Sequence, residues 1–208
     1  MNITEAIESR RSVKHYDPNH RMPEADVAQL IQQAKLAPSS FNMQNTRFVL
    51  VRDPELGQQI RAVAWNQAQV TDASLLVILC ADLNAHLKNP ARYWSHVAKE
   101  VQDFIVPALT PFYDGKPQLI RDEAMRSTGF SGMTLMLAAR GLGYDSCPMI
   151  GFDADAVAKL IELPADHAIG FMIAIGKPTK PAWPRGSLLS DSEVVIQDRF
   201  PESLAATN

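Results

Sequence analysis

The sequence lacks the features that mark several large classes of protein. Its net charge is −3, and its 20 lysines and arginines are scattered along 208 residues. No basic surplus is therefore available to neutralise a nucleic-acid backbone. The longest apolar runs, such as residues 75–81, are too short to span a bilayer, and the amino terminus has no apolar signal core. We expect a cytoplasmic protein that binds neither nucleic acid nor membrane.

The sequence also lacks the signatures of several kinds of site. It has two cysteines, Cys80 and Cys147, both in apolar stretches, which favours buried thiols over a disulfide framework. The five histidines form no metal-binding motif, and there is no glycine-rich dinucleotide motif, P-loop or serine nucleophile elbow. We therefore expect no metal. An enzyme without an obvious nucleophile or acid–base pair takes its reactivity from a cofactor.

The pattern of apolar residues predicts helices interleaved with short strands. The hydrophobic content of 46% and charged content of 21% are those of an ordinary globular protein. About five strands are expected, at 48–51, 74–81, around Cys147, at 169–175 and at 194–196. Six helices are expected, at 3–7, 23–37, 54–63, from Trp94 to an end near Pro107 and Pro111, at 122–140 and at 153–163. This alternation predicts an α+β fold, an α/β/α sandwich in which helices cover a small sheet.

Two features indicate that a second copy of the chain completes the protein. The helix at 122–140 has almost no polar face, and burial between two subunits is a natural way to cover it. The segment after Gly176, KPTKPAWPRGS, cannot form a core element. We expect one domain, residues 1–208, in which residues 177–208 are an extension that reaches the partner subunit of a homodimer.

Three segments are candidates for function, and each also has a plainer explanation. Arg10–Lys14 puts three cations and a hydroxyl in five residues, which suits a phosphate ligand or the solvated end of a helix. Ala37–Asn45 is rich in hydroxyls and amides, which suits a binding loop or a simple turn. Pro148–Phe152 follows a strand, and its glycine lets a flat ligand approach or only makes the turn into the next helix.

Together, and in this order, these segments resemble the nitroreductase family of flavin enzymes. The R-R-S-x-K opening, the A-P-S-S-x-N-x-Q loop, the stretch Asn66-Gln67-x-Gln69 before D-A-S, and the P-x-x-G-F turn recur at compatible intervals over residues 3–199. The resemblance implies an intertwined homodimer with a small, mostly antiparallel sheet. It also implies bound FMN, with NAD(P)H as the electron donor.

The resemblance implies a role for individual residues. The FMN phosphate would be bound by Arg10 and Ser12, the ribityl or phosphate region by Arg11, and the N1/O2 edge of the ring by Lys14. The pyrimidine edge or ribityl chain would be held by Asn66 and Gln69, and the ring would be overlaid by Met149, Ile150 and Gly151. Pro148, just before them, would also belong to the cofactor site. The pocket would be closed from the opposite subunit by Pro38, Ser39, Ser40, Asn42 and Gln44.

Two positions depart from the family pattern. Ile150 stands where members of the family often have an acidic residue. A contact of its backbone with the ring is still possible, but a role of the side chain in handling water or substrate is not. The carboxy-terminal phosphate clamp of the family has two cations, whereas this chain offers Arg185, with Ser187 near it, and no second cation. Phosphate affinity would therefore depend more heavily on Arg10 and Arg185.

The implied reaction is a ping-pong cycle. NAD(P)H delivers a hydride to flavin N5 and leaves before a nitroaromatic, a quinone or a similar acceptor enters. The chain then supplies orientation and electrostatics, with no catalytic side chain of its own. The acceptor pocket would be walled by Phe41, Trp94, Phe104, Phe112 and Tyr113, and core packing is the alternative for these aromatic residues.

Other functions stay open at this point. A protein of the same fold can reduce enones or aldehydes, and a protein that binds flavin for sensing or storage would carry the same cofactor residues without turnover. A purely structural protein is the weakest alternative, because it leaves the Arg10–Lys14 cluster and the Ser39–Gln44 loop unexplained.

Overall fold

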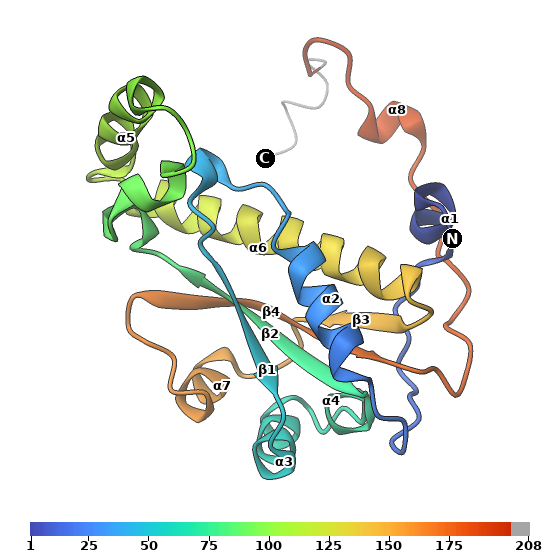
Figure 1. Ribbon diagram of the computed structural model, residues 1–208. Coiled ribbons are helices and arrows are strands. Elements are labelled where there is room, and N and C mark those ends of the chain that lie inside the picture. The colour runs from blue at the N-terminus through green and yellow to red at the C-terminus, as the bar shows by residue number, and fades with distance from the viewer. Residues whose placement is uncertain (201–208) are drawn as a thin grey trace.

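The computed structural model of the protein describes residues 1–200 and contains a four-stranded antiparallel sheet with helices on both faces (Figure 1). The strands, in the order β1-β2-β4-β3 across the sheet, are β1 Thr46–Val51, β2 Leu75–Asp82, β4 His167–Gly176 and β3 Asp145–Met149. The expected α+β sandwich is thus confirmed. Among the described residues, no helix has both the length and the apolar character that a bilayer crossing requires.

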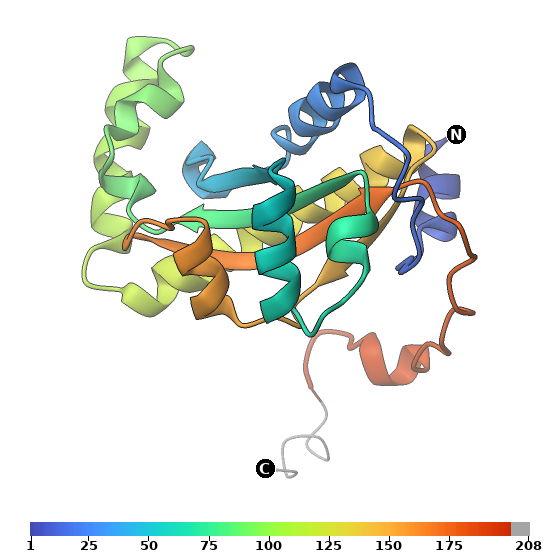
Figure 2. The same ribbon diagram turned by 90° about the horizontal axis from the view of Figure 1, so that it is seen from below.

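Strand β2 is the centre of the core, because all eight of its residues are buried. Its side chains alternate between the two faces of the sheet, so the odd-numbered residues of Leu75–Leu79 join one apolar cluster and the even-numbered residues of Leu76–Cys80 join another. The first face is covered by α2 (Glu24–Ala34) and α6 (Pro117–Gly141), and the second by α3 (Pro54–Val63), α4 (Gln69–Asp72) and α7 (Ala154–Leu160). Figure 2 shows α3 and α7 in front of the sheet and α6 behind it.

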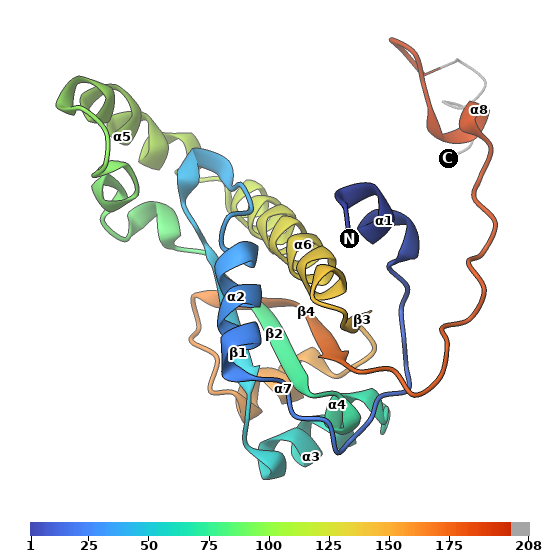
Figure 3. The ribbon, with the colours of Figure 1, turned by 45° about the vertical axis from the view of Figure 1, so that its right-hand side comes forward.

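Between β2 and α6 the chain leaves the sheet and forms a separate helical part, residues 83–116, which we call the excursion. It contains two short 3-10 helices, Ala85–Leu87 and Pro90–Trp94, and α5 (Lys99–Tyr113). Figures 1 and 3 place α5 well beyond the end of the sheet. The excursion has its own apolar cluster, whose buried members are Ala85, Tyr93, Leu109 and Tyr113 together with Met43 from the loop before β1.

The expected end of the helix in the excursion was wrong. Instead of beginning at Trp94 and ending near the prolines, α5 begins at Lys99 and runs through both Pro107 and Pro111. Both prolines are exposed, while Leu109 and Tyr113, one turn apart, are buried in the excursion's cluster. Apolar burial on that side therefore holds the helix together despite the lost backbone hydrogen bonds.

The prediction of a fifth strand at 194–196 was also wrong, because the described residues form only four strands in the sheet. Residues Asp191–Val194 form a short helix, α8, and Val194 and Val195 are exposed. After β4 the chain runs beside the residues that follow α1 (Ile3–Ser9) and then away from the body of the molecule (Figures 1 and 3). Among the described residues, 194–196 therefore pair with no strand of the sheet. The rest of the expected extension, residues 201–208, lies outside the described residues.

A charged network fixes the base of the excursion to the sheet. Asp82, at the end of β2, has a side chain that is only 1% exposed and pairs with Arg47 at 2.9 Å and Lys88 at 2.9 Å. Lys88 also contacts Asp166 at 2.6 Å, and His167 Nδ1 lies 2.7 Å from the same carboxylate. The Lys88 ammonium thus lies between the carboxylates of Asp82 and Asp166 and pairs with both. Its hydrogen bond, followed by that of His167, lowers the pKa of Asp166 to about 2.

We predict that the close packing of α6 on β4 limits what can replace Gly170. A Cβ at this position would lie 2.7 Å from Thr128 Oγ1 and 3.0 Å from Thr128 Cβ. Gly170→Ala should lower the free energy of unfolding by about 1–3 kcal/mol through overpacking, measured by urea denaturation. Made in a Thr128→Ala background, it should be less destabilising. Gly57→Ala in α3, where nothing lies within 4 Å, is the control and should not destabilise; equal losses at both glycines would contradict this packing.

A second prediction concerns acid stability. Because the pKa of Asp166 is lower in the folded protein than its ordinary value of 3.8, this carboxylate stabilises the fold above about pH 4, and its contribution is lost as the pH falls towards 2. Asp166→Asn should therefore make the decline in unfolding free energy over this range shallower than in the wild type. Urea denaturation at stepped pH checks this, with Glu162→Gln as control. Parallel curves for wild type and Asp166→Asn would disprove it.

Candidate functional site

The Arg10–Lys14 segment and the carboxy-terminal segment together line one cationic cavity. Its volume is about 320 Å³, and its walls include Arg10, Arg11, Ser12, Lys14 and Arg185. No carboxylate is among the lining residues. The structure therefore brings together four cations that the family resemblance placed around FMN, although they come from opposite ends of the chain. Ser187 is exposed and does not line this cavity.

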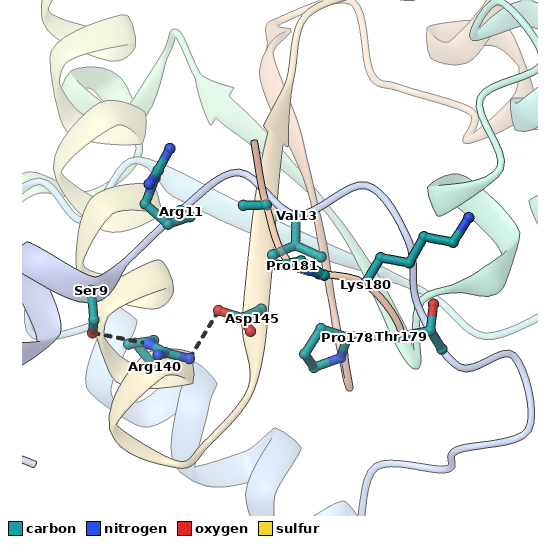
Figure 4. Close-up of a pocket in the computed structure, with 10 residues that line it drawn as sticks. Ser9, Arg11, Val13, Arg140, Asp145, Pro178, Thr179, Lys180 and Pro181 are labelled. Atoms are coloured by element: carbon teal, nitrogen blue, oxygen red, sulfur yellow. Dashed lines mark hydrogen bonds and ion pairs between the residues drawn. The ribbon is translucent and has the colours of Figure 1, made fainter. Parts of the chain in front are cut away.

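Arg140 fixes the start of this segment to the body of the protein. Figure 4 shows its guanidinium between Ser9, the last residue of α1, and Asp145 of β3. Its Nε donates to Ser9 Oγ at 3.0 Å and its Nη1 to Asp145 Oδ1 at 3.0 Å. Val13, itself buried, donates its backbone N–H to Ser146 O at 3.1 Å. The cationic segment is thus anchored to α6 and to β3.

The carboxy-terminal segment is held by the same cations. Arg185 donates to the carbonyls of Glu8 at 2.8 Å and Arg10 at 3.1 Å. Arg11 donates to the carbonyl of Trp183, and the Lys14 ammonium lies 5.5 Å from the centre of a Trp183 ring. From the sequence, Trp183 stays open between the wall of the pocket and core packing. Its position over Lys14 follows from the path of residues 177–185 alongside the amino terminus, which no local pattern predicts.

The turn after β3 lies against the segment that contains Asn66 and Gln69. Gln67 Nε2 donates to Gly151 O at 2.8 Å, and its Oε1 accepts from Gln69 Nε2 at 3.0 Å. A Cβ on Gly151 would be 2.5 Å from the Trp65 ring, so only glycine allows this close approach. Asn66 accepts from Arg61 at 2.9 Å. The Asn66–Gln69 segment and the Pro148–Phe152 turn, both predicted to contact the cofactor, are therefore neighbours in space.

The residues of this turn point in different directions. Met149 is 5% exposed and belongs to the core, whereas Ile150 is 83% exposed. Pro148 is partly buried at the end of β3. Any contact that Met149 makes with a ligand therefore runs through its backbone, while the Ile150 side chain is free to meet one.

The Ala37–Asn45 loop has a strained backbone that several hydrogen bonds hold in place. Phe41, Asn42 and Gln44 have φ values of 52°, 53° and 47°, a region that residues other than glycine seldom adopt. Ser39 Oγ accepts from the Gln44 N–H at 2.9 Å. Asn42 Nδ2 donates to the carbonyl of Tyr93 at 3.0 Å. The loop is thus closed on itself and tied to the excursion.

The same loop borders a second cavity of about 310 Å³. Its walls include the predicted residues Pro38, Ser39 and Gln44, together with Lys35, Arg47 and Ser131. Sequence reasoning missed the last three, because a lysine at a helix end, an arginine inside a strand and a serine inside a helix carry no local signal. This cavity and the cationic cavity share no lining residue.

Of the five predicted pocket aromatics, one is buried, two are partly buried and two are exposed. Tyr113 is 1% exposed, and the Trp94 indole N–H donates to the Phe41 carbonyl at 3.1 Å. Phe41 packs against Phe112, with ring centres 5.5 Å apart. Phe112 is 45% exposed and Phe104 is 81% exposed. The exposed rings are thus the ones available to a ligand, while Tyr113 and Trp94 hold the loop.

Helix α6 separates the two groups of predicted residues. The loop contacts it at Glu123, which accepts from the Ser40 N–H at 3.3 Å. The cationic segment contacts it at Arg140, 17 positions along the same helix. At 1.5 Å per residue the two contact points are about 26 Å apart. A single chain therefore keeps the loop and the cationic cavity at separate places.

Comparison with known proteins gives consistent matches over most of the chain. The model described as "Nitroreductase family" matches residues 7–177. Protein DrgA of Synechocystis is 56% identical over 182 residues, which are 88% of this chain and 87% of that protein. MhqN of Bacillus subtilis, named as a candidate NAD(P)H nitroreductase, is 32% identical and covers 88% of this chain and 93% of its own length.

Two further matches bear on the cofactor and the substrate. The crystal structure of a candidate nitroreductase from Exiguobacterium sibiricum in complex with FMN has a TM-score of 0.86 and 28% identity, covering 95% of this chain and 98% of that one. An enone reductase of Lactiplantibacillus plantarum is 29% identical, covering 84% of this chain and 85% of that protein.

We predict that Arg140 holds the cationic segment in place. Arg140→Gln leaves Asp145, whose side chain is 13% exposed, without its charged partner and should destabilise the protein by roughly 1–3 kcal/mol. Hydrogen exchange at the Val13 amide should also accelerate, because its strand contact opens more often. Arg126→Gln is the control on the same helix, since its pair with Glu123 leaves the Arg126 side chain 54% exposed. Similar exchange rates at Val13 in both variants would refute the proposed role.

Proposed function

Since the chain belongs to the nitroreductase family, we propose that it is an FMN-dependent NAD(P)H oxidoreductase that reduces nitroaromatics, quinones or similar acceptors. The observation that carries this proposal is the cationic cavity formed by Arg10, Arg11, Ser12, Lys14 and Arg185. The FMN-bound relative and the NAD(P)H nitroreductase name of another support it. A cytoplasmic location is part of the proposal.

The cavity has the donor set that an FMN phosphate requires. A phosphate monoester carries close to two negative charges, and arginine binds it with paired hydrogen bonds. The cavity offers three guanidiniums, one ammonium and the Ser12 hydroxyl, with no lining carboxylate to oppose an anion. Arg185 reaches backbone carbonyls at 2.8 and 3.1 Å, and a phosphate oxygen would be a stronger acceptor for it than either.

The ring of the cofactor would extend from this cavity towards the Gly151 turn. Ser12 pairs with Ser146 of β3 in a parallel bridge, and β3 leads directly to that turn. Burial raises the pKa of the Cys147 thiol in β3, and the nearby Lys14 and Arg10 charges offset part of that rise. The chemistry that bound FMN supplies is two-electron transfer from NAD(P)H to an acceptor. Lys14 would stabilise negative charge on the ring, and the backbone at Ile150 and Gly151 would orient it.

The pocket would be completed by a second copy of the chain. The separation of about 26 Å along α6 keeps the Ser39–Gln44 loop from the cationic cavity of its own chain. Apolar residues are exposed on the helices where a partner would dock: Ile3 and Ile7 on α1, and Phe130 and Met133 on α6. We therefore infer an intertwined homodimer in which residues 177–208 embrace the partner. In it, Phe104 and Phe112 would border the acceptor.

Enone reduction is the second candidate reaction. The relative from Lactiplantibacillus plantarum is an enone reductase over nearly the same length, and a conjugated carbonyl presents a flat electron acceptor much as a quinone does. Parallel assays of NADPH oxidation with a quinone, a nitroaromatic and an enone separate the two candidates. Bound flavin without turnover of any of them would instead support a binding or storage protein.

We predict that the purified protein is yellow and that Arg10→Gln with Lys14→Gln weakens FMN binding. Loss of charge-assisted hydrogen bonds to phosphate and ring should raise the FMN dissociation constant at least tenfold, measured by fluorescence titration. Lys159→Gln removes an exposed charge on α7 and should bind FMN as the wild type does. A colourless protein that stays colourless after incubation with FMN would exclude the proposed function.

A further inference from the structure

The hydroxyl of Ser40 receives a hydrogen bond from a buried tyrosine. Tyr113 Oη donates to Ser40 Oγ at 2.7 Å. The tyrosine is 1% exposed, whereas Ser40 is only partly buried. Its ring is fixed by neighbours on two sides, Phe112 with ring centres 4.9 Å apart and His86 at 5.5 Å. The donor therefore has little freedom to move relative to the serine.

The direction of this hydrogen bond leaves the proton of Ser40 available. Burial raises the pKa of Tyr113, and the Glu123 carboxylate adds to that rise against the opposing Ser40 hydrogen bond and the Arg126 charge. The phenol thus keeps its proton at neutral pH, and the structure has it donating that proton to Ser40. A serine hydroxyl has one hydrogen and two lone pairs. In the described residues, Ser40 Oγ accepts from Tyr113 and donates to no protein group, while its backbone N–H is taken by Glu123.

We propose that Tyr113 is a positioning residue that makes Ser40 a directed hydrogen-bond donor to an oxygen atom of the ligand in the redox pocket. This inference rests on the proposed function. The oxygen belongs either to the electron acceptor, as a quinone carbonyl or nitro group, or to a carbonyl of the cofactor ring. Both gain negative charge on reduction, and a donor fixed in advance stabilises such charge best. Accepting from Tyr113 also polarises the Ser40 O–H and strengthens its own donation.

Three variants of the holoenzyme test the coupling between the two residues. Ser40→Ala removes the donor and should lower kcat/KM for a quinone by roughly tenfold to a hundredfold. Tyr113→Phe keeps the ring and removes only the bond to Ser40, so it should lower kcat/KM by a smaller factor, about threefold to tenfold. In a Ser40→Ala background, Tyr113→Phe should have no further effect on kcat/KM, because it acts only through the serine.

Separate half-reactions and the FMN dissociation constant identify the oxygen. If it belongs to the acceptor, Tyr113→Phe should slow reoxidation by the quinone in stopped-flow experiments and leave reduction by NADPH and FMN affinity unchanged. If it belongs to the cofactor ring, FMN should bind more weakly and both half-reactions should slow. Either pattern supports the proposal.

Tyr144→Phe is the matched control. This tyrosine is also buried and donates to a side chain, Asp26 Oδ2, at 2.6 Å, but it lies in the cluster of α2 and α6. It should lower thermal stability without changing FMN affinity or either half-reaction. Wild-type kinetics and FMN affinity in Tyr113→Phe, or an equal additional loss of activity in the Ser40→Ala background, would overturn the proposal. A wild-type protein without flavin turnover would instead defeat the proposed function.

Discussion

The fixed length of α6 is the constraint on which the arrangement of this molecule depends. The helix covers one face of the sheet and contacts α1 near one end and the Ala37–Asn45 loop near the other. Close packing keeps it in register, since Gly170 of β4 lies directly against Thr128 and Gly132 lies against Phe171. Two groups of polar residues are therefore held at a constant distance, and in the proposed homodimer each would be one half of a pocket that the other chain completes.

The Ala37–Asn45 loop and the cationic cavity are kept in their conformations by different interactions. In the loop, backbone strain of about 1–3 kcal/mol per residue is offset by hydrogen bonds from the excursion, including those of Trp94 and Tyr113. In the cationic cavity, Arg11 and Arg185 rest on backbone carbonyls that an anion would replace. Both surfaces are thus ordered before a ligand arrives, which lowers the entropy lost on binding.

Sequence patterns predicted the layers of the fold better than the irregular parts. Alternating burial of β2 and the apolar faces of α2 and α3 follow from local periodicity. The run of α5 through Pro107 and Pro111 does not, because burial of Leu109 and Tyr113 is a tertiary effect. The same holds at the site. The Arg10–Lys14 cluster can be recognised from the sequence. The contact of Arg140 with Ser9 and the position of Trp183 over Lys14 cannot, because each joins residues more than 100 positions apart.

The charged base of the excursion has a consequence for which changes in residues 83–116 the protein tolerates. The buried carboxylate of Asp82, where β2 ends and the excursion begins, pairs with two cations. One is Lys88, six positions later within the excursion, and the other is Arg47 of the neighbouring strand β1. Above that base, residues 83–116 pack around an apolar cluster that they share with Met43 of the Ala37–Asn45 loop. A change in residues 83–116 that displaces Lys88 would therefore leave the buried Asp82 carboxylate without one of the cations that balance it.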